Sequence, residues 1–200
     1  INKLNIHNYK IISEPFGKDT SAAIAIASII SPLINNLLIL PADHVWIPNK
    51  LVNTVEKGLD FCDNNIVFIG IKPKYPETGY GYIKHDNSNN LLKFVEKPNI
   101  DIAKSYFESG DYLWNSGVFL FNNNYIKTQF EEYAPNIYKD VYSTLQNSGD
   151  LDSNEIIINK DYFEKVQKIS IDFSIMEHQD NGKVICYDDY WCDVGSFESL

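Results

Sequence analysis

Apolar runs and apolar stripes at helical spacing alternate along this chain, separated by clusters of glycine, proline and asparagine. The runs predict strands at 37–40, 66–71, 82–85, 91–95, 118–121 and 184–187, with 82–85 and 91–95 forming a hairpin turned through 87–90. The stripes predict helices at 20–30, 49–62, 101–109, 122–133 and 136–146, and a short helix opening at 170. This alternation of strands and helices is typical of a layered α/β domain.

The chain reads as a single domain over residues 1–200. A length of 200 residues with 44% hydrophobic and 14% aromatic content is enough to bury a sizeable core. The longest apolar stretch, 22–40, is interrupted by Ser28, Ser31, Pro32 and Asn35, so it predicts a helix, a turn and a strand rather than a membrane span.

Charge narrows the range of partners. A net charge of -10 argues against nucleic-acid polymers and anionic membranes, both of which need a basic face. All 17 basic residues are lysines, so phosphate binding must rest on lysine, backbone amides or a metal. Cys62, Cys186 and Cys192 are odd in number and show no CxxC pairing, which favours a reducing compartment and predicts a cytoplasmic protein.

Two aspartates follow apolar segments far apart in the chain. Asp43 comes after a strand that stops at Pro41, and Asp193 follows Trp191 near the end. The carboxyl ends of strands in open α/β sheets are where ligands bind, and paired carboxylates suit Mg²⁺ when phosphates complete its shell. The alternatives are a helix cap for Asp43 and a turn for Asp193, and His44 by itself is more typical of packing than of metal binding.

Further polar groups stand among strand residues. Glu96 and Lys97 end an apolar strand, where a surface ion pair is the alternative to a phosphate-binding lysine. Asn115 precedes a strand and offers both a donor and an acceptor to sugar hydroxyls, although Asn-Ser-Gly is also a common turn. Asp172 sits in the first turn of a predicted helix, where it would complement the helix dipole.

The segment before the first helix is a second candidate binding region. It places Thr20 at a helix N-terminus, where free backbone amides attract anions or polar ring edges, with Asp19 or Thr20 as the N-cap. Glu14 is a carboxylate that could accept from both N–H donors of guanine, which thymine and uracil do not present. The alternative is a solvated loop glutamate.

Taken in order, these segments resemble the sugar-phosphate nucleotidyltransferases, most closely the bacterial mannose-1-phosphate guanylyltransferases. The motifs that carry the resemblance are Glu14-Pro15-Phe16-Gly17-Lys18-Asp19-Thr20, Pro41-Ala42-Asp43-His44, Pro76-Glu77-Thr78-Gly79-Tyr80-Gly81-Tyr82-Ile83, Phe94-Val95-Glu96-Lys97-Pro98, Trp114-Asn115-Ser116-Gly117, Ser170-Ile171-Asp172-Phe173 with Met176-Glu177, and Trp191-Cys192-Asp193-Val194-Gly195-Ser196. Each motif is short, but seven in family order are hard to attribute to chance.

The resemblance implies a Rossmann-like, glycosyltransferase-A-like α/β/α fold with a mixed, mainly parallel sheet. It also implies transfer of GMP from GTP to mannose 1-phosphate, giving GDP-mannose and pyrophosphate, with Mg²⁺ as cofactor and homo-oligomer formation left open. The residues that it assigns are Asp43 and Asp193 as metal ligands, Lys97 at the sugar phosphate, Gly81, Glu96 and Asn115 at the hexose, Glu14 and Thr20 at the guanine, and Asp172 near the sugar and metal.

The sequence also departs from the family pattern. The glycine-rich loop that wraps the triphosphate is absent from these residues, and the family's C-terminal region is not reached, so the domain reads as partial at both ends. Lys18, Asp19 and Phe197 stand where the family usually has arginine, asparagine and tryptophan. Two alternatives therefore stay open: a non-catalytic remnant or partner subunit that binds a sugar nucleotide without turnover, and an enzyme of the same chemistry that uses uridine or thymidine.

Overall fold

The computed structural model describes residues 7–194. The helices are α1 (Thr20–Ile30), α2 (Pro48–Leu59), α3 (Ile100–Ser109), α4 (Asn123–Tyr133), α5 (Pro135–Gln146), α6 (Lys160–Phe163), α7 (Ile171–Ser174) and the 3-10 helix η2 (Met176–His178). The strands are β1 (Ile11–Ser13), β2 (Asn36–Ile39), β3 (His44–Trp46), β4 (Ile66–Ile71), β5 (Tyr82–His85), β6 (Leu91–Val95), β7 (Tyr112–Asn122), β8 (Glu155–Ile157), β9 (Gly182–Tyr187) and β10 (Trp191–Asp193).

The central sheet is mixed, with strand order β6-β5-β7-β4-β9 and β2 paired to β7. The expectation of a mainly parallel sheet was wrong. Among the described strands of this sheet, β4 and β9 pair in parallel and every other pairing is antiparallel. The physical reason is the long strand β7, which runs against β2, β4 and β5 and so makes each of its pairings antiparallel.

Both faces of this sheet are covered, so the predicted α/β/α layering is confirmed. All six residues of β4 are buried, and their side chains alternate between two cores. Ile66 and Phe68 pack with α1, α4 and α5, whereas Val67, Ile69 and Ile71 pack on the other face with residues of α2 and α3. A strand buried on both faces must be apolar throughout, as the run at 66–71 predicted.

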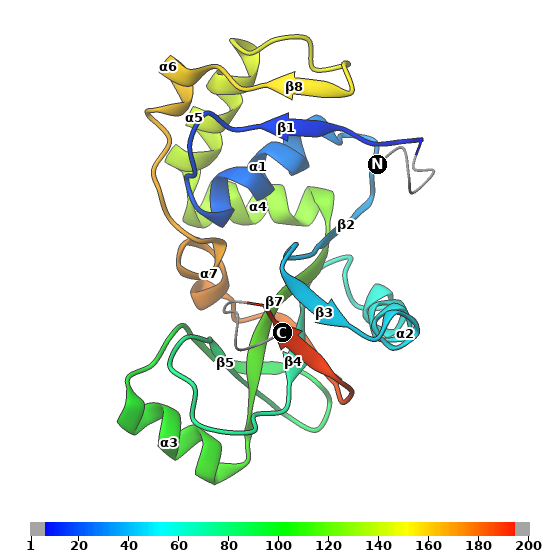
Figure 1. Cartoon of the computed structure of the whole chain (residues 1–200), viewed down its shortest axis with the longest axis vertical. Helices are drawn as coiled ribbons and strands as arrows, with labels where there is room; N and C mark the ends of the chain where they lie inside the picture. The colour runs from blue at the N-terminus through cyan, green and yellow to red at the C-terminus, as the bar shows by residue number, and fades with distance from the viewer. Residues whose placement is uncertain (1–6, 195–200) are drawn as a thin grey trace.

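A second body lies above the central sheet in Figure 1, made of α1, α4, α5 and α6 together with the parallel pair β1–β8. Helix α1 packs against both α4 and α5. The segment that carries α7 connects the two bodies, so that residues of both reach the region around α7 (Figure 1).

Several predicted boundaries agree closely with the structure. Helix α1 and strands β4, β5 and β6 have the predicted bounds, and the Asp19 side chain caps α1 by accepting from the Thr20 N–H. In α2 the predicted apolar face is only partly buried: Val52 is 53% exposed, while Thr54 and Gly58 are buried instead.

Strand β7 differs most from the prediction, because it begins at Tyr112 rather than at residue 118. Its pairing with β4 shifts register between Phe68 and Gly70, which leaves a bulge in β7 around Gly117. Gly117 has a φ of 70°, a left-handed conformation that glycine adopts without strain. The Asn-Ser-Gly motif, for which a turn was one alternative, is therefore a bulge inside a strand, a feature that re-aims side chains near functional sites.

Two further observations concern the extent of the fold. Gly195 and Ser196 of the last motif, and Phe197, lie outside the described residues. Within 7–194, no helix is both long enough and apolar enough to cross a membrane.

Candidate active site

Six of the nine predicted site residues line one pocket of about 250 Å³. The pocket lies where the beginning of β5, the end of β6 and the bulge of β7 meet α7 and β10. The predicted residues among its lining are Gly81, Glu96, Lys97, Asn115, Asp172 and Asp193. They come from five separate stretches of sequence, and the fold brings them together.

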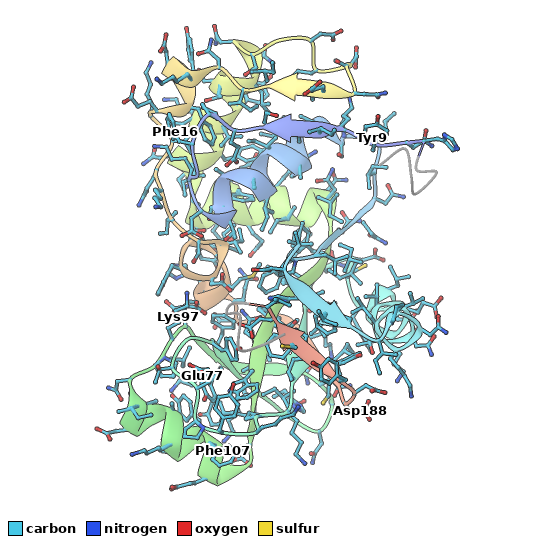
Figure 2. The ribbon with its side chains drawn as sticks, in the orientation of Figure 1. Tyr9, Phe16, Glu77, Lys97, Phe107 and Asp188 are labelled. Atoms are coloured by element: carbon cyan, nitrogen blue, oxygen red, sulfur yellow. The ribbon has the colours of Figure 1, made fainter. Side chains whose placement is uncertain are left out.

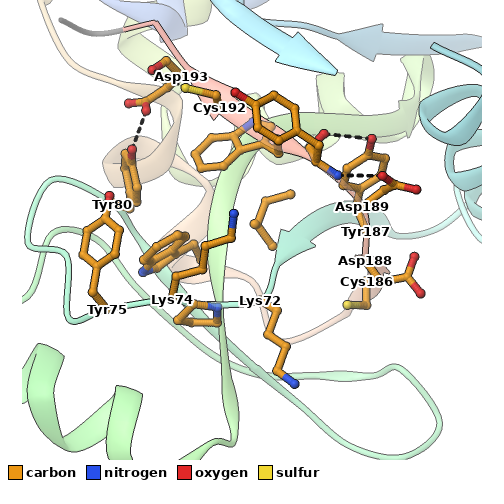
Figure 3. Close-up of a pocket in the computed structure, with 15 residues that line it drawn as sticks. Lys72, Lys74, Tyr75, Tyr80, Cys186, Tyr187, Asp188, Asp189, Cys192 and Asp193 are labelled. Atoms are coloured by element: carbon orange, nitrogen blue, oxygen red, sulfur yellow. Dashed lines mark hydrogen bonds between the residues drawn. The ribbon is translucent and has the colours of Figure 1, made fainter. Parts of the chain in front are cut away.

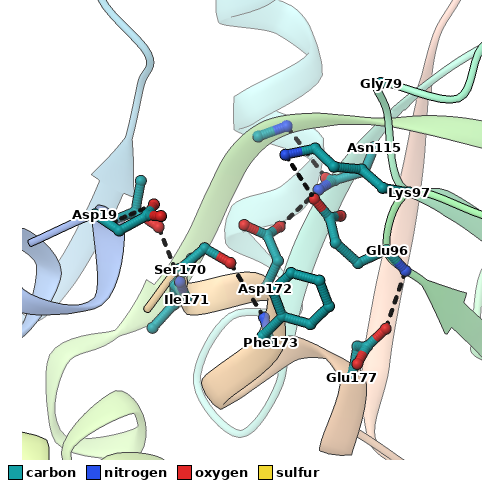
Figure 4. A network of polar contacts seen from close by, with 12 residues as sticks. Asp19, Gly79, Glu96, Lys97, Asn115, Ser170, Ile171, Asp172, Phe173 and Glu177 are labelled. Carbon is teal, nitrogen blue, oxygen red and sulfur yellow. Dashed lines mark hydrogen bonds and ion pairs between the residues drawn. The ribbon is translucent and has the colours of Figure 1, made fainter. Parts of the chain in front are cut away.

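The bulge of β7 fixes the position of Asn115. Its side-chain oxygen accepts from the Gly117 N–H at 3.1 Å, and its side-chain nitrogen donates to Asp172 Oδ1 at 2.9 Å (Figure 4). Its backbone N–H donates to the Gly81 carbonyl at 2.7 Å. Asn115 is therefore held by its own bulge and by two other segments, and presents a fixed amide at the pocket wall.

Asp172 reaches the pocket from the first turn of α7, as predicted from its place after Ser170. The Ser170 hydroxyl caps this helix by accepting from the Phe173 N–H at 3.3 Å. Burial raises the pKa of Asp172, and the hydrogen bond from Asn115 and the charge of Lys97 act in the opposite direction. Asp172 thus belongs to a polar network that faces the pocket.

Glu96 and Lys97 are adjacent in sequence but lie in opposite environments. The Glu96 side chain is 6% exposed and the Lys97 side chain 58% exposed, with Glu96 Oε1 3.4 Å from Lys97 Nζ. Burial, reinforced by the charge of Asp172, raises the pKa of Glu96 to about 7. Lys97 lies beside the α7 segment (Figure 2), where its ammonium group remains open to solvent at the pocket mouth.

One carboxylate oxygen of Glu96 is available to accept a hydrogen bond from a ligand. Glu96 Oε2 is buried without a hydrogen-bond partner among the described residues. An unpaired buried carboxylate oxygen is unfavourable, and a hydroxyl donor entering the pocket would satisfy it.

Gly81 leaves the space in which this carboxylate sits. A Cβ at residue 81 would lie 2.6 Å from Glu96 Oε2 and 3.2 Å from the Asn115 Cβ. Any side chain at this position would therefore displace the groups that form the pocket.

The two predicted metal ligands are brought together by short strands that the sequence pattern did not reveal. Strands β3 and β10 pair antiparallel with His44 opposite Asp193, and the Val194 N–H donates to the Asp43 carbonyl at 2.8 Å. Asp193 lines the pocket, whereas Asp43 lies just outside it with its side chain 68% exposed. Across the described residues, no three His, Cys, Asp or Glu side chains form a metal-binding group.

These two carboxylates would suit a divalent metal ion whose shell is completed by substrate phosphates. Tyr80 donates its hydroxyl to Asp193 Oδ1 at 2.5 Å, which leaves the other carboxylate oxygen available (Figure 3). Burial and the hydrogen bond to Asp193 both raise the pKa of Tyr80, so its hydroxyl stays protonated as a donor.

His44 lines the pocket and packs against Trp191. Its ring lies edge-on to Trp191, with centroids 5.4 Å apart, and its Nδ1 accepts from the Trp191 indole at 3.4 Å. Burial lowers the pKa of His44, while the charges of Asp43 and Asp193 act against that shift.

Glu14 and Thr20 lie apart from this pocket, at the α1 end of the molecule. Glu14 Oε1 is buried without a described partner, and burial raises the Glu14 pKa. The Thr20 hydroxyl accepts from the Ile171 N–H at 2.8 Å, one residue before Asp172. Of the two predicted guanine-facing residues, Thr20 is thus connected to the pocket through the start of α7.

A larger cavity of about 610 Å³ adjoins the first one (Figure 3). Tyr80, Trp191 and Asp193 line both cavities, so they form the wall between them. Sequence reasoning assigned no role to Tyr80 or to Glu177, whose contacts depend on chain segments far apart in sequence. The position of Tyr80 between Gly79 and Gly81, inside one of the family motifs, was the feature of the sequence that indicated a role for it.

The model of the nucleotidyl transferase family matches residues 2–200. The chain belongs to this family. Curated relatives include a mannose-1-phosphate guanylyltransferase of Escherichia coli, 37% identical over 98% of this chain and 46% of the relative. Mannose-1-phosphate guanylyltransferase RfbM of Salmonella typhimurium is 39% identical over 95% of this chain and 42% of the relative. The chain thus spans less than half the length of these nucleotidyl transferase relatives.

Solved structures support the fold of this nucleotidyl transferase chain. A Helicobacter pylori structure described as mannose-6-phosphate isomerase matches with a TM-score of 0.89 and 24% identity, covering 96% of this chain and 77% of that chain. A Thermus thermophilus structure described as mannose-1-phosphate geranyltransferase matches with a TM-score of 0.79 and 29% identity, covering 94% of this chain and 55% of that chain. The first shows the fold alone.

Proposed function

We propose that this chain is the nucleotidyltransferase domain, residues 1–200, of a mannose-1-phosphate guanylyltransferase. In the proposed reaction a phosphate oxygen of mannose 1-phosphate attacks the α-phosphorus of GTP, which forms GDP-mannose and releases pyrophosphate. The observation that carries the proposal is the single pocket formed by six of the residues assigned from the family resemblance. Several relatives with this printed name, at 32–39% identity, support it.

The chain's own residues would mainly bind and orient, because phosphoryl transfer demands little covalent chemistry from the protein. Glu96 Oε2 is an acceptor for a sugar hydroxyl, and Asn115 supplies an amide beside it. Lys97 is the exposed cation at the pocket mouth and would pair with the sugar phosphate. Gly81 keeps the hexose site open.

The family generally uses a divalent metal ion, and we propose Mg²⁺ for this member. Asp43 and Asp193 would hold it, and when bound it would neutralise phosphate charge. Glu14, with its unpartnered buried oxygen, would accept from the N–H donors of guanine. Thr20 would lie at the same end of the site as Glu14, near the guanine. An acidic chain with small phosphorylated substrates is also consistent with the cytoplasm as its location.

The test is pyrophosphate release by the purified protein from mannose 1-phosphate with GTP, UTP or TTP in the presence of Mg²⁺. We expect GTP to be preferred and Lys97→Ala to lower kcat/KM by about a hundredfold. Lys104→Ala, which removes an exposed lysine on α3, is the matched control and should not change the rate. Equal rates with UTP, or no pyrophosphate from a folded protein, would contradict the proposal.

A further inference from the structure

The backbone between Glu96 and Lys97 determines how the pocket's carboxylate and ammonium groups are placed. Lys97 has a φ of 42°, a left-handed conformation that is unfavourable for a non-glycine residue. Such a conformation persists only where the surroundings hold it. Strand β6 is the last strand in the order β6-β5-β7-β4-β9, and the bridge that links it to β9, between Asn90 and Lys183, lies at its beginning and not at Glu96.

Glu177 stabilises the backbone at Glu96 by a hydrogen bond. Its Oε1 accepts from the backbone N–H of Glu96 at 3.0 Å (Figure 4). Glu177 belongs to η2, which packs against β6 and is anchored by the fully buried Met176. The exposed carboxylate of Glu177 therefore reaches the backbone of Glu96 from a segment that Met176 anchors.

Electrostatic attraction does not explain why the Glu177 carboxylate lies beside Glu96. It lies near the carboxylate of Glu96 and contributes to raising the pKa of that group, so the two charges repel. Lys97 Nζ pairs with Glu96 Oε1 rather than with Glu177 among the described ion pairs. The favourable contact that remains is the hydrogen bond to the backbone, which is stronger for a charged acceptor.

The same short segment also holds the opposite side of the pocket. Asp172, in α7, accepts from Asn115 of β7, and Glu177, in η2, accepts from the backbone at the end of β6. Two carboxylates from residues 171–178 thus hold the bulge of β7 that carries Asn115 and the end of β6 that carries Glu96, and so set the width of the pocket between them.

We propose that Glu177 is a positioning residue for the sugar phosphate: through the Glu96 N–H it holds the turn that presents Glu96 and Lys97 to the pocket. This inference rests on the proposed function for its substrate and on the hydrogen bond for its geometry. It predicts that Glu177 affects the sugar-phosphate half of the site and leaves the nucleotide half unchanged.

The test compares Glu177→Ala with Glu177→Gln, whose amide oxygen can accept from the same N–H. Asp180→Ala is the matched control, because it removes an exposed acid three residues further along. Calorimetry with Mg²⁺ would give the Kd for mannose 1-phosphate and for GTP. We expect Glu177→Ala to weaken mannose 1-phosphate binding about tenfold and Glu177→Gln to restore most of it, with GTP binding unchanged throughout.

Hydrogen exchange measured without ligand separates this inference from the proposed function. Glu177→Ala should speed amide exchange at the end of β6, in residues 94–97, while Asp180→Ala should not. Unchanged exchange there, Gln behaving like Ala, or equal loss of both ligands would overturn the positioning role. A wild-type protein that binds neither ligand, yet shows the exchange difference, would refute the proposed function and leave the positioning of the turn established.

Discussion

Replacing Glu96 by glutamine should stabilise the protein while impairing the pocket. The Glu96 carboxyl is nearly inaccessible, one of its oxygens has no described partner, and Asp172 adds a second negative charge nearby. Glutamine keeps the shape of the side chain but removes its charge. The change therefore isolates the free energy of holding an ionised carboxylate at this position.

The pKa gives both the sign and the size of the effect. Burial raises the Glu96 pKa from its ordinary 4.5 to about 7, so the folded protein favours the neutral acid. Below pH 4.5 both states are neutral and folding carries no penalty. The penalty grows as pH rises towards 7, because the unfolded chain ionises first, and it is complete above pH 7 at about 3 kcal/mol, using about 1.4 kcal/mol per pKa unit.

The assay is urea unfolding of wild type and Glu96→Gln between about pH 5.5 and 8.5, which stays above the pI of about 4.8. We expect the stability advantage of the variant to increase by about 2 kcal/mol across this range. Glu108→Gln, at an exposed position on α3, is the control and should follow the wild type. Parallel pH profiles for wild type and Glu96→Gln would refute the reasoning.

Three other changes have defined outcomes. Gly81→Ala should lower stability by about 1–3 kcal/mol and abolish sugar-phosphate binding in calorimetry, because its Cβ would lie 2.6 Å from Glu96 Oε2. Tyr80→Phe should raise the Mg²⁺ concentration needed for nucleotide-sugar binding about tenfold, because Asp193 loses the donor that orients it. Phe163→Ala should cost about 3–5 kcal/mol in urea unfolding, because this ring is fully buried. A bound sugar phosphate in Gly81→Ala would show that the pocket does not need the space above Glu96. Tyr142→Phe, at an exposed position on α5, is the control for Tyr80→Phe, and an equal Mg²⁺ effect in both would remove the special role of Tyr80. A loss below about 1 kcal/mol for Phe163→Ala would place that ring outside the core.

The elements that sequence predicted well are those with a strong local pattern. Helix α1 has a cap at Asp19 and a stop at Ser31, and β4 is apolar throughout, so local chemistry defined their bounds. Strands β3 and β10 are three residues each and pair across most of the chain, so no local pattern marks them. Their pairing is what brings Asp43 and Asp193 together.

In the candidate site too, local sequence motifs were predicted and long-range contacts were not. Sequence and family resemblance named Glu96, Lys97 and Asn115, and the structure places them in one pocket. The sequence left a turn open as one alternative at Asn-Ser-Gly and predicted the strand only from residue 118, because the two extra residues of the bulge interrupt the strand period. The hydrogen bond of Glu177 depends on a residue 81 positions away, so it becomes visible only in the folded chain.

The most direct test of the proposed function is calorimetric binding of GDP-mannose in the presence of Mg²⁺, with UDP-glucose for comparison and Asp193→Asn as the variant. We expect Mg²⁺-dependent binding that prefers GDP-mannose and weakens in Asp193→Asn. A folded protein that binds neither sugar nucleotide, or binds both equally with no effect of the variant, would contradict the account.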